Sequence, residues 1–420
     1  MTILQIASLL IVLAAVFGTV NYFVLKLPAT IGILVVALFA SVAVLLIDRL
    51  FPASSMAEEI RSVVVGIDFT DAFLDGMLGL LLFAGALHVK VSDLRQQWSA
   101  VFLMATMGVA LSTAVVGFGF AWVAGVPLAV ALVFGALISP TDPVAVLGVL
   151  REAKLSTSLE TQIAGESLFN DGVGYVVYLI LVSIAFPVAA GGEAGHGEST
   201  LASAALLFLR EAGGGLVLGL VLGWLVFRVM RRINDPSLEV LITLGLAFGG
   251  YELAVALGVS APIMAVCAGL LIGDVGARHG MSEATRDYVS TFWTLVDEIL
   301  NAILFLLIGV EVFAITFDGD YVSAVLFAIP LALLARLVSV WVPVTLLRPI
   351  RSFDRGTVPI MTWGGLKGGV SVALALGLPP SEWRSLILAA TYGVVIFSII
   401  VQGLTVGRLA RHVGREPELV

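Results

Sequence analysis

The chain has 420 residues, of which 60% are hydrophobic and only 12% are charged, whereas about a quarter of the residues of an average soluble domain are charged. This composition excludes an ordinary soluble fold, and the formal net charge of -8 gives no support for nucleic acid binding. The single cysteine, Cys267, excludes an intrachain disulfide and a cysteine-based metal site.

Thirteen segments along the chain have the hydropathy of membrane-spanning helices. The apolar runs are mostly about 17 to 25 residues long, which suits a hydrocarbon layer of about 30 Å. We interpret the first segment as a retained helix, because it has neither a basic start nor a cleavage region. In chain order the predicted helices cover residues 3–22, 27–47, 72–88, 98–122, 127–150, 161–187, 203–229, 237–256, 260–273, 292–315, 321–347, 357–378 and 385–407.

The lysines and arginines divide unequally between alternate loops. Sixteen of the 22 fall in one set of loops and four in the other, while Arg336 and Lys367 lie inside predicted helices. Because cytoplasmic loops carry the excess of basic residues, we expect a cytoplasmic C-terminus and, with an odd number of helices, an external N-terminus. The expected location is the cell membrane, with the lipid bilayer around an all-α, multi-pass protein.

A small and acidic segment at residues 188–202 divides the chain near its middle. Six predicted helices precede the seventh and six follow it, and an odd intervening helix inverts the topology of the second half. We therefore expect an inverted repeat. Its parts are a first six-helix repeat at 1–187, a linker with the seventh helix at 188–236, a second six-helix repeat at 237–408 and a short cytoplasmic tail at 409–420.

The fifth predicted helix of each repeat is interrupted. Proline removes a backbone donor and glycine tolerates unwound backbone, so both helices are expected to be discontinuous and to free carbonyls and amides near mid-membrane. Interruptions at corresponding positions of two repeats are typical of a transporter's substrate site. The interruptions read Ser139-Pro140-Thr141-Asp142-Pro143 in the first repeat and Gly364-Gly365-Leu366-Lys367-Gly368-Gly369 in the second.

Ionisable residues at membrane depth concentrate in four of the predicted helices. Each such group is costly in the membrane and is therefore a candidate for function. Arg336 lies in the middle of an apolar run and needs a partner, for which we propose Glu166, and we expect this pair to anchor the helix bundle. The candidates are Asp142, Glu166, Asp171, Arg336 and Lys367.

The helix predicted at 161–187 is expected to carry one polar flank. A hard cation such as Na+ needs several oxygen ligands, which Asp171, Ser167 and carbonyls freed near Thr141 and Asp142 can supply. Burial also favours the protonated form of a carboxylate. One site can therefore hold either a cation or a proton, which is the chemistry of exchange. The i,i+4 pairs that form the flank are Glu166 with Asn170 and Ser167 with Asp171.

Several other polar or small residues have structural interpretations. Lys367 either compensates the unwound glycine segment or faces the cytoplasmic funnel, and the sequence leaves both open. Asp297, Glu298 and Glu311 flank the tenth helix, where they either line an aqueous funnel or, as we expect, act as capping or surface groups. Three glycines at every fourth position of the seventh helix predict close helix packing rather than a ligand site: Gly215, Gly219 and Gly223.

Three motifs, which occur in this order over nearly the whole membrane chain, resemble those of the monovalent cation:proton antiporter family. This family includes prokaryotic NhaP-type proteins and animal sodium/proton exchangers. Thr141-Asp142-Pro143-Val144-Ala145-Val146 is similar to the family's discontinuous-helix signature. The other two are Gly165-Glu166-Ser167-Leu168-Phe169-Asn170-Asp171, similar to Gly-Glu-Ser-Leu-x-Asn-Asp, and Trp363-Gly364-Gly365-Leu366-Lys367-Gly368-Gly369, similar to a Gly-Leu-Arg-Gly segment.

The resemblance implies an antiporter that exchanges Na+, or else Li+ or K+, for H+. It implies that Asp171 binds the cation and the proton in turn, and an Asn-Asp pair implies electroneutral 1:1 exchange. A homodimer with a mobile core domain is implied, with no cofactor and no enzymatic activity. The implied cation and proton site consists of Asp171, Ser167, Thr141, Asp142 and Asn170, with Asp171, Ser167 and Thr141 as Na+ ligands. The implied structural residues are the ion pair Glu166 and Arg336 and the helix-break residues Pro140, Pro143, Lys367 and Gly368.

The chain departs from the family pattern at three points. It has Ala84 where many relatives have glutamate, Lys367 where they have arginine, and no long tail after the last predicted helix. Two other functions stay open: a cation channel, although no filter-like carbonyl segment is visible, and an organic anion transporter, since half-helix N-termini attract carboxylates. An intramembrane protease is not supported, because its catalytic motifs are missing.

Overall fold

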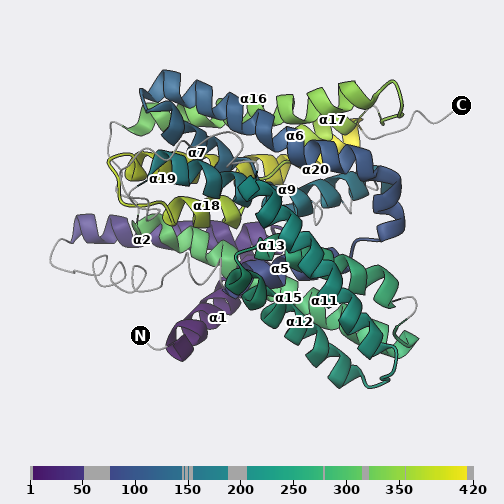
Figure 1. The fold of residues 1–420 in the computed structure, drawn as a ribbon. Helices are drawn as coiled ribbons and strands as arrows, with labels where there is room; N and C mark the ends of the chain where they lie inside the picture. The colour runs from purple at the N-terminus through teal and green to yellow at the C-terminus, as the bar shows by residue number, and fades with distance from the viewer. Residues whose placement is uncertain are drawn as a thin grey trace, which may run out of the picture.

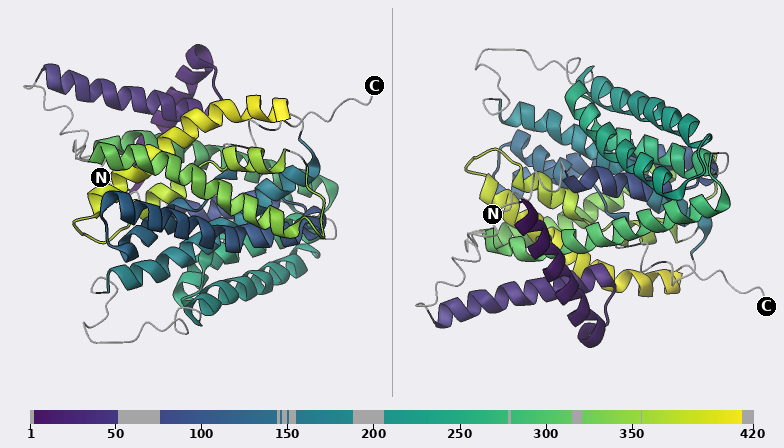
Figure 2. Two further views of the ribbon diagram at one scale, coloured as in Figure 1. Left: turned by 90° about the horizontal axis from the view of Figure 1, so that it is seen from above. Right: turned by 90° about the horizontal axis from the view of Figure 1, so that it is seen from below.

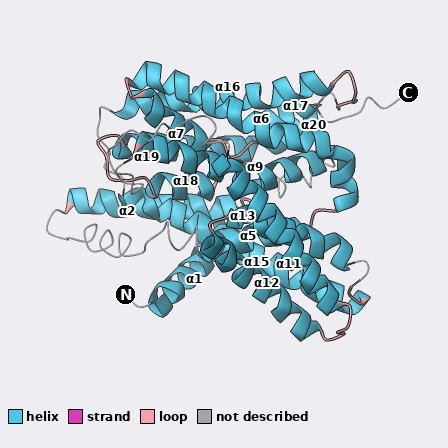
Figure 3. Ribbon diagram, in the orientation of Figure 1, coloured by secondary structure: helices cyan, strands magenta, loops and turns pink. Residues whose placement is uncertain are grey.

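The computed structural model describes residues 3–51, 76–143, 146, 150, 155–187, 206–277, 280–314, 321–354 and 356–413. Within these residues all regular secondary structure is helical (Figure 3). Eight of the described helices are long and apolar enough to cross a membrane, and three further apolar helices are shorter. The predicted all-α, multi-pass class is confirmed, while the count of thirteen spans and the four-part division of the chain remain predictions.

The described helices follow the predicted order along the chain, and several continue into π-helical or 3-10 turns, labelled η. From the N-terminus they are α1 (Ile3–Val20), η1 (Asn21–Leu25), α2 (Ala29–Leu50), α5 (Leu78–Leu87), α6 (Val91–Ala124), α7 (Leu128–Ile138), α9 (Thr157–Ala185), η4 (Leu209–Gly213), α11 (Gly214–Met230), α12 (Pro236–Leu257), α13 (Ala261–Leu270), η5 (Leu271–Gly276), α15 (Glu283–Val310), η6 (Glu311–Ala314), α16 (Val322–Leu347), α17 (Thr357–Trp363), α18 (Gly369–Leu376), α19 (Arg384–Phe397), η8 (Ser398–Gln402) and α20 (Gly403–Val413).

The helices pack in two groups. In the α6 group, α6 contacts α7, α9 and α16, while α17, α18, α19 and α20 complete the layer around them. In the α13 group, α13 contacts α5, α11 and α12, and α15 contacts α1, α2 and α5. Figure 1 shows the α6 group in the upper part of the molecule and the α13 group below it. In both views of Figure 2, α2 lies at the edge of the molecule.

Close packing in the α13 group depends on the glycines of α11. Gly215, Gly219 and Gly223 are all buried. A Cβ on Gly219 would lie 2.5 Å from the Met264 carbonyl oxygen, and one on Gly223 would lie 3.3 Å from Ala268 Cα, both on α13. The four-residue spacing of these glycines therefore brings the backbones of α11 and α13 into contact, as predicted from the sequence.

Several helices extend beyond the boundaries that hydropathy predicts; α6, for example, begins at Val91 rather than at residue 98. α15 begins at Glu283 rather than at residue 292, because the Ser282 side chain accepts a hydrogen bond from the Thr285 N–H and caps a polar first turn. α20 continues to Val413, past the predicted end at 407, so helix occupies the beginning of the stretch expected to be a tail. Polar turns do not raise hydropathy, which is why hydropathy does not predict these extensions. The linker predicted at 188–202 lies outside the described residues.

Candidate functional site

Two interrupted helices meet inside the α6 group. The first break lies between α7 and Pro143, where helical backbone resumes, and the second lies between α17 and α18. The Asp142 N–H donates to the Leu366 carbonyl over 2.8 Å, so the two non-helical segments contact each other directly. The predicted discontinuity of both helices is confirmed, and it gathers free helix ends at one place.

Thr141 is tied to α9 by hydrogen bonds in both directions. Its N–H donates to Asn170 Oδ1 over 3.3 Å, and its Oγ1 accepts from Asn170 Nδ2 over 2.8 Å. The same hydroxyl lies 3.0 Å from Ser167 Oγ. All three residues are buried. These bonds hold the non-helical backbone against α9 and satisfy polar groups that the break leaves without helical partners.

Glu166 on α9 and Arg336 on α16 form a buried, bidentate ion pair. Arg336 Nη2 donates to Glu166 Oε2 over 2.7 Å, and Nη1 donates to Oε1. Arg336 Nε also donates to the Met361 carbonyl near the end of α17 over 3.1 Å, and Asn170 Nδ2 donates to Glu166 Oε1 over 3.3 Å. The pair therefore connects α9, α16 and α17. Gly365 makes room for it, because a Cβ at that position would overlap Arg336 Nε.

Lys367 reaches across the crossing to the other interrupted helix. Its Nζ donates to the carbonyls of Ser139 and Pro140 over 3.0 and 3.3 Å, and its N–H donates to Ser398 Oγ over 2.9 Å. The carbonyls at the end of α7 carry partial negative charge, which an ammonium group offsets. This geometry supports charge compensation, but of α7 rather than of the glycine segment that contains Lys367.

Asp142 lies at the beginning of α18. A Cβ on Gly368 would lie 2.7 Å from Asp142 Cβ and 2.9 Å from its Oδ2, so only glycine permits this approach. Helix N-termini carry partial positive charge, so a nearby carboxylate stabilises them. Each charged side chain of the crossing therefore faces a helix end of opposite charge, Lys367 at α7 and Asp142 at α18.

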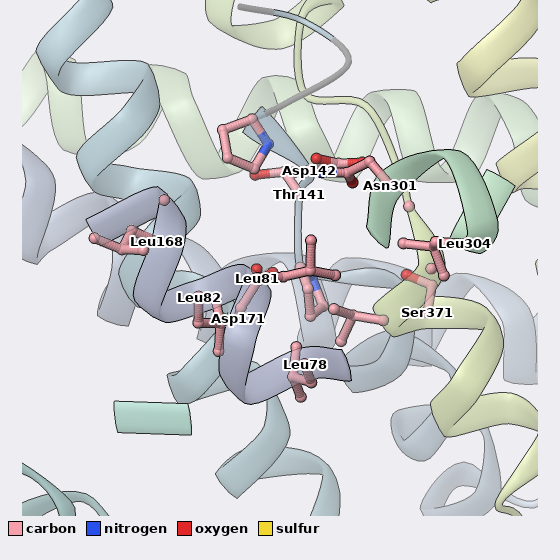
Figure 4. A pocket seen from close by; sticks show the side chains of 16 residues that line it. Leu78, Leu81, Leu82, Thr141, Asp142, Leu168, Asp171, Asn301, Leu304 and Ser371 are labelled. Atoms are coloured by element: carbon pink, nitrogen blue, oxygen red, sulfur yellow. The ribbon is translucent and has the colours of Figure 1, made fainter. Parts of the chain in front are cut away.

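A cavity of about 60 Å³ lies between this crossing and the α13 group (Figure 4). Thr141, Asp142 and Asp171 contribute polar lining, and the Asp171 side chain is 7% exposed. One buried water needs about 10–15 Å³ of such space, so the cavity has room for a small cation with part of its hydration shell. The apolar wall comes from α5, α9 and α15 through Leu78, Leu81, Leu82, Leu168 and Leu304.

The structure separates the predicted site residues into two sets. Five of them lie behind the cavity lining. Ser167 and Asn170 hydrogen-bond to Thr141 there. Glu166 pairs with Arg336, and Lys367 bonds to the carbonyls at the end of α7. Ala84 on α5, where the sequence departs from the family pattern, is fully buried and is not part of the cavity wall. Its neighbour Gly85 lines the cavity. The predicted residues that line the cavity are Pro140, Thr141, Asp142, Pro143, Asp171 and Gly368.

Sequence reasoning missed two polar residues of the cavity wall, Asn301 on α15 and Ser371 on α18. Each is a polar residue in an apolar run, which is the signal that would have found it. It also missed Gln402, whose Nε2 donates to the Trp363 carbonyl at the end of α17 over 2.9 Å. That partner lies 39 positions away in the sequence, so no local pattern predicts it.

Comparison with known proteins gives matches along nearly the whole chain. The family described as sodium/hydrogen exchanger, transmembrane, matches residues 2–412. The chain is 44% identical to the Na(+)/H(+) antiporter NhaP of Pseudomonas aeruginosa, over 98% of this chain and 97% of that protein. It is 34% identical to the Na(+)/H(+) antiporter NhaH of Halobacillus dabanensis, over 98% of each. The fold is similar to that of the sodium proton antiporter MjNhaP1 from Methanocaldococcus jannaschii, with a TM-score of 0.76, 20% identity and coverage of 98% and 99% of the two chains.

Proposed function

This chain belongs to the sodium/hydrogen exchanger family, and on that premise we propose how its buried site exchanges Na+ for H+. The protein is a Na+/H+ antiporter of the membrane, a transporter rather than an enzyme. The observation that carries the proposal is the position of Asp171, a buried carboxylate that lines the cavity between the two helix groups.

Asp171 is the proposed exchanging group. Asp171, Asp142 and Thr141 all line one cavity, and a hard monovalent cation needs several oxygen ligands of the kind that these residues carry. Either Na+ or H+ neutralises Asp171, and a carboxylate in a poorly solvated site strongly favours being neutralised. The two ions therefore compete for one group. Ser167 supports this site indirectly, by fixing the Thr141 hydroxyl.

The proposed stoichiometry is one cation for one proton. Asn170 does not titrate, and its amide is already engaged with Thr141 and Glu166. Glu166 is held by Arg336, so its charge is balanced in both half-cycles. Asp171 then alternates between a bound cation and a bound proton, and the loaded site has the same charge in each case. Exchange is therefore electroneutral.

The two helix groups suggest how the site is opened. The cavity lies at their boundary, since α9 and α18 of the α6 group and α5 and α15 of the α13 group all contribute to its lining. We propose that the α6 group moves against the α13 group and exposes Asp171 to each side of the membrane in turn. We further propose a homodimer, an external N-terminus and a cytoplasmic C-terminus, the orientation resting on the distribution of basic residues.

A fluorescence-dequenching measurement in proteoliposomes tests the proposal. Na+, Li+ or K+ is added against a preset pH gradient, and Na+ is expected to drive proton release through Asp171. A large current that is not coupled to protons would support the cation channel instead. Inhibition by organic acids, with no response to cations, would support the organic anion transporter.

A further inference from the structure

The cavity has a polar wall that the proposed function does not use. Ser371 lies in the first turn of α18, is 1% exposed and lines the cavity. Its Oγ has no hydrogen-bond partner among the described residues. A buried hydroxyl without a hydrogen-bond partner lowers the stability of the folded protein, and in native proteins such a group usually binds a water or an ion.

Asn301 on α15 is the second polar residue of this wall. It is 2% exposed, and its Nδ2 donates to the carbonyl oxygen of Asp297 over 2.8 Å and to Asp297 Oδ1 over 3.0 Å. The amide hydrogens are thereby directed toward Asp297, and the amide oxygen is the group of this side chain that is left to accept a ligand. In Figure 4, Asn301, Leu304 and Ser371 lie on one side of the cavity and Leu168 on the other.

The chemistry of this wall fits a cation that keeps part of its water. A carboxamide oxygen and a hydroxyl are uncharged oxygen ligands, which suit a hard cation without binding it tightly. The N-terminus of α18 beside Ser371 disfavours a bare cation, but the Asp142 carboxylate at the same helix end offsets that charge. We therefore expect Asn301 and Ser371 to bind a cation weakly and transiently. The carboxylate of Asp171 should bind it more tightly.

We propose that Asn301 and Ser371 form an outer subsite that holds a partly hydrated monovalent cation before it displaces the proton from Asp171. This inference rests on the proposed function and adds two residues to the same site. Asn301 belongs to the α13 group and Ser371 to the α6 group, so the subsite is complete only when the two groups are apposed as in this structure. Holding the cation thus becomes coupled to conformation.

Cation titrations of the full chain in proteoliposomes test the subsite. Ser371→Ala and Asn301→Leu are each expected to raise the half-saturating Na+ concentration about three- to tenfold, as loss of one modest ligand predicts. The maximal rate and its pH dependence at saturating Na+ are expected to stay unchanged, because Asp171 is intact. Thr113→Val is the matched control: Thr113 Oγ1 on α6 is also buried and has no hydrogen-bond partner in the described part of the chain, but Thr113 does not line the cavity.

The outcomes separate the subsite from the function on which it rests. Unchanged half-saturation in both variants, with Asp171→Asn inactive, overturns the subsite and leaves the proposed function standing. Exchange retained by Asp171→Asn would instead overturn the function itself. Should Ser371→Ala fail to fold, Ser371→Cys decides the question, since it keeps the size of the side chain but replaces oxygen with a poor ligand for a hard cation.

Discussion

Arg336 and Glu166 face each other across α16 and α9 with both guanidinium Nη atoms donating to the two carboxylate oxygens, at 2.7 Å for Nη2 and Oε2. Glu166→Gln and Arg336→Gln should each destabilise the protein by about 3–5 kcal/mol, because each leaves the other charge buried and unpaired. The double substitution should cost less than the sum of the two. Thermal unfolding in detergent measures all three, and strict additivity would contradict the pairing.

Gly365→Ala should be strongly destabilising, because its Cβ would overlap Arg336 Nε and push the guanidinium away from Glu166. Gly249→Ala on α12 is the control, since nothing lies within 4 Å of a Cβ at that position. From helix propensity alone, Gly249→Ala should leave the free energy of unfolding unchanged or raise it by up to about 1 kcal/mol. Equal loss of yield and melting temperature in both variants would refute the steric argument.

Lys367→Met should lower stability by about 2 kcal/mol, because it removes the cation that faces the last carbonyls of α7. Lys367→Arg keeps the charge and several donors, so it should retain most of the melting temperature and of the exchange activity. Differential scanning fluorimetry together with dequenching distinguishes the two variants. A stable, active Lys367→Met protein would show that the carbonyls need no cation.

Asp171→Asn should abolish Na+-driven proton release while the protein still folds, because an amide cannot bind a proton and a cation in turn. Among the described residues, no cationic side chain lies within 4 Å of the Asp171 carboxylate. The substitution therefore does not strand a partner charge in the protein interior. Size-exclusion chromatography checks folding before transport is measured. Substantial remaining exchange would mean that another group carries the proton.

The pH dependence follows from competition at Asp171. As the pH rises, the proton is lost from the site more easily, so the half-saturating Na+ concentration should fall, by about tenfold per pH unit while protonated Asp171 predominates. Acidification should have the opposite effect. Initial rates measured over a series of Na+ concentrations at several pH values test this, and a half-saturation that does not change with pH would contradict competition for one carboxylate.

Electroneutral exchange predicts no response to membrane potential. With the potential clamped by K+ and valinomycin, after K+ is shown not to be a substrate, Na+ and H+ gradients should balance at equal ratios at every potential. A balance point that moves with potential would bring in Asp142 as a second proton site. Asp142→Asn would then be the deciding variant, since restored independence of potential assigns the extra proton to that carboxylate.

Much of the architecture follows from local pattern. The apolar runs give the helices, and proline and glycine give both breaks, because backbone constraints at these residues act within a few positions. The i,i+4 spacing from Glu166 to Asn170 appears directly as a hydrogen bond between their side chains. The contact between Glu166 and Arg336 is also predictable from the sequence, because an arginine in an apolar run requires an acidic partner and few acidic residues lie at membrane depth.

The helices, their interruptions and the positions of the charged residues therefore follow from short-range chemistry. Which groups meet depends on the packing of the folded chain. It paired Lys367 with Ser139 and Pro140, which the sequence separates by 228 and 227 positions. It also brought Asn301 and Ser371 to the cavity of Asp171. Such contacts arise because two interrupted helices cross and two helix groups pack together, and no local pattern encodes that packing.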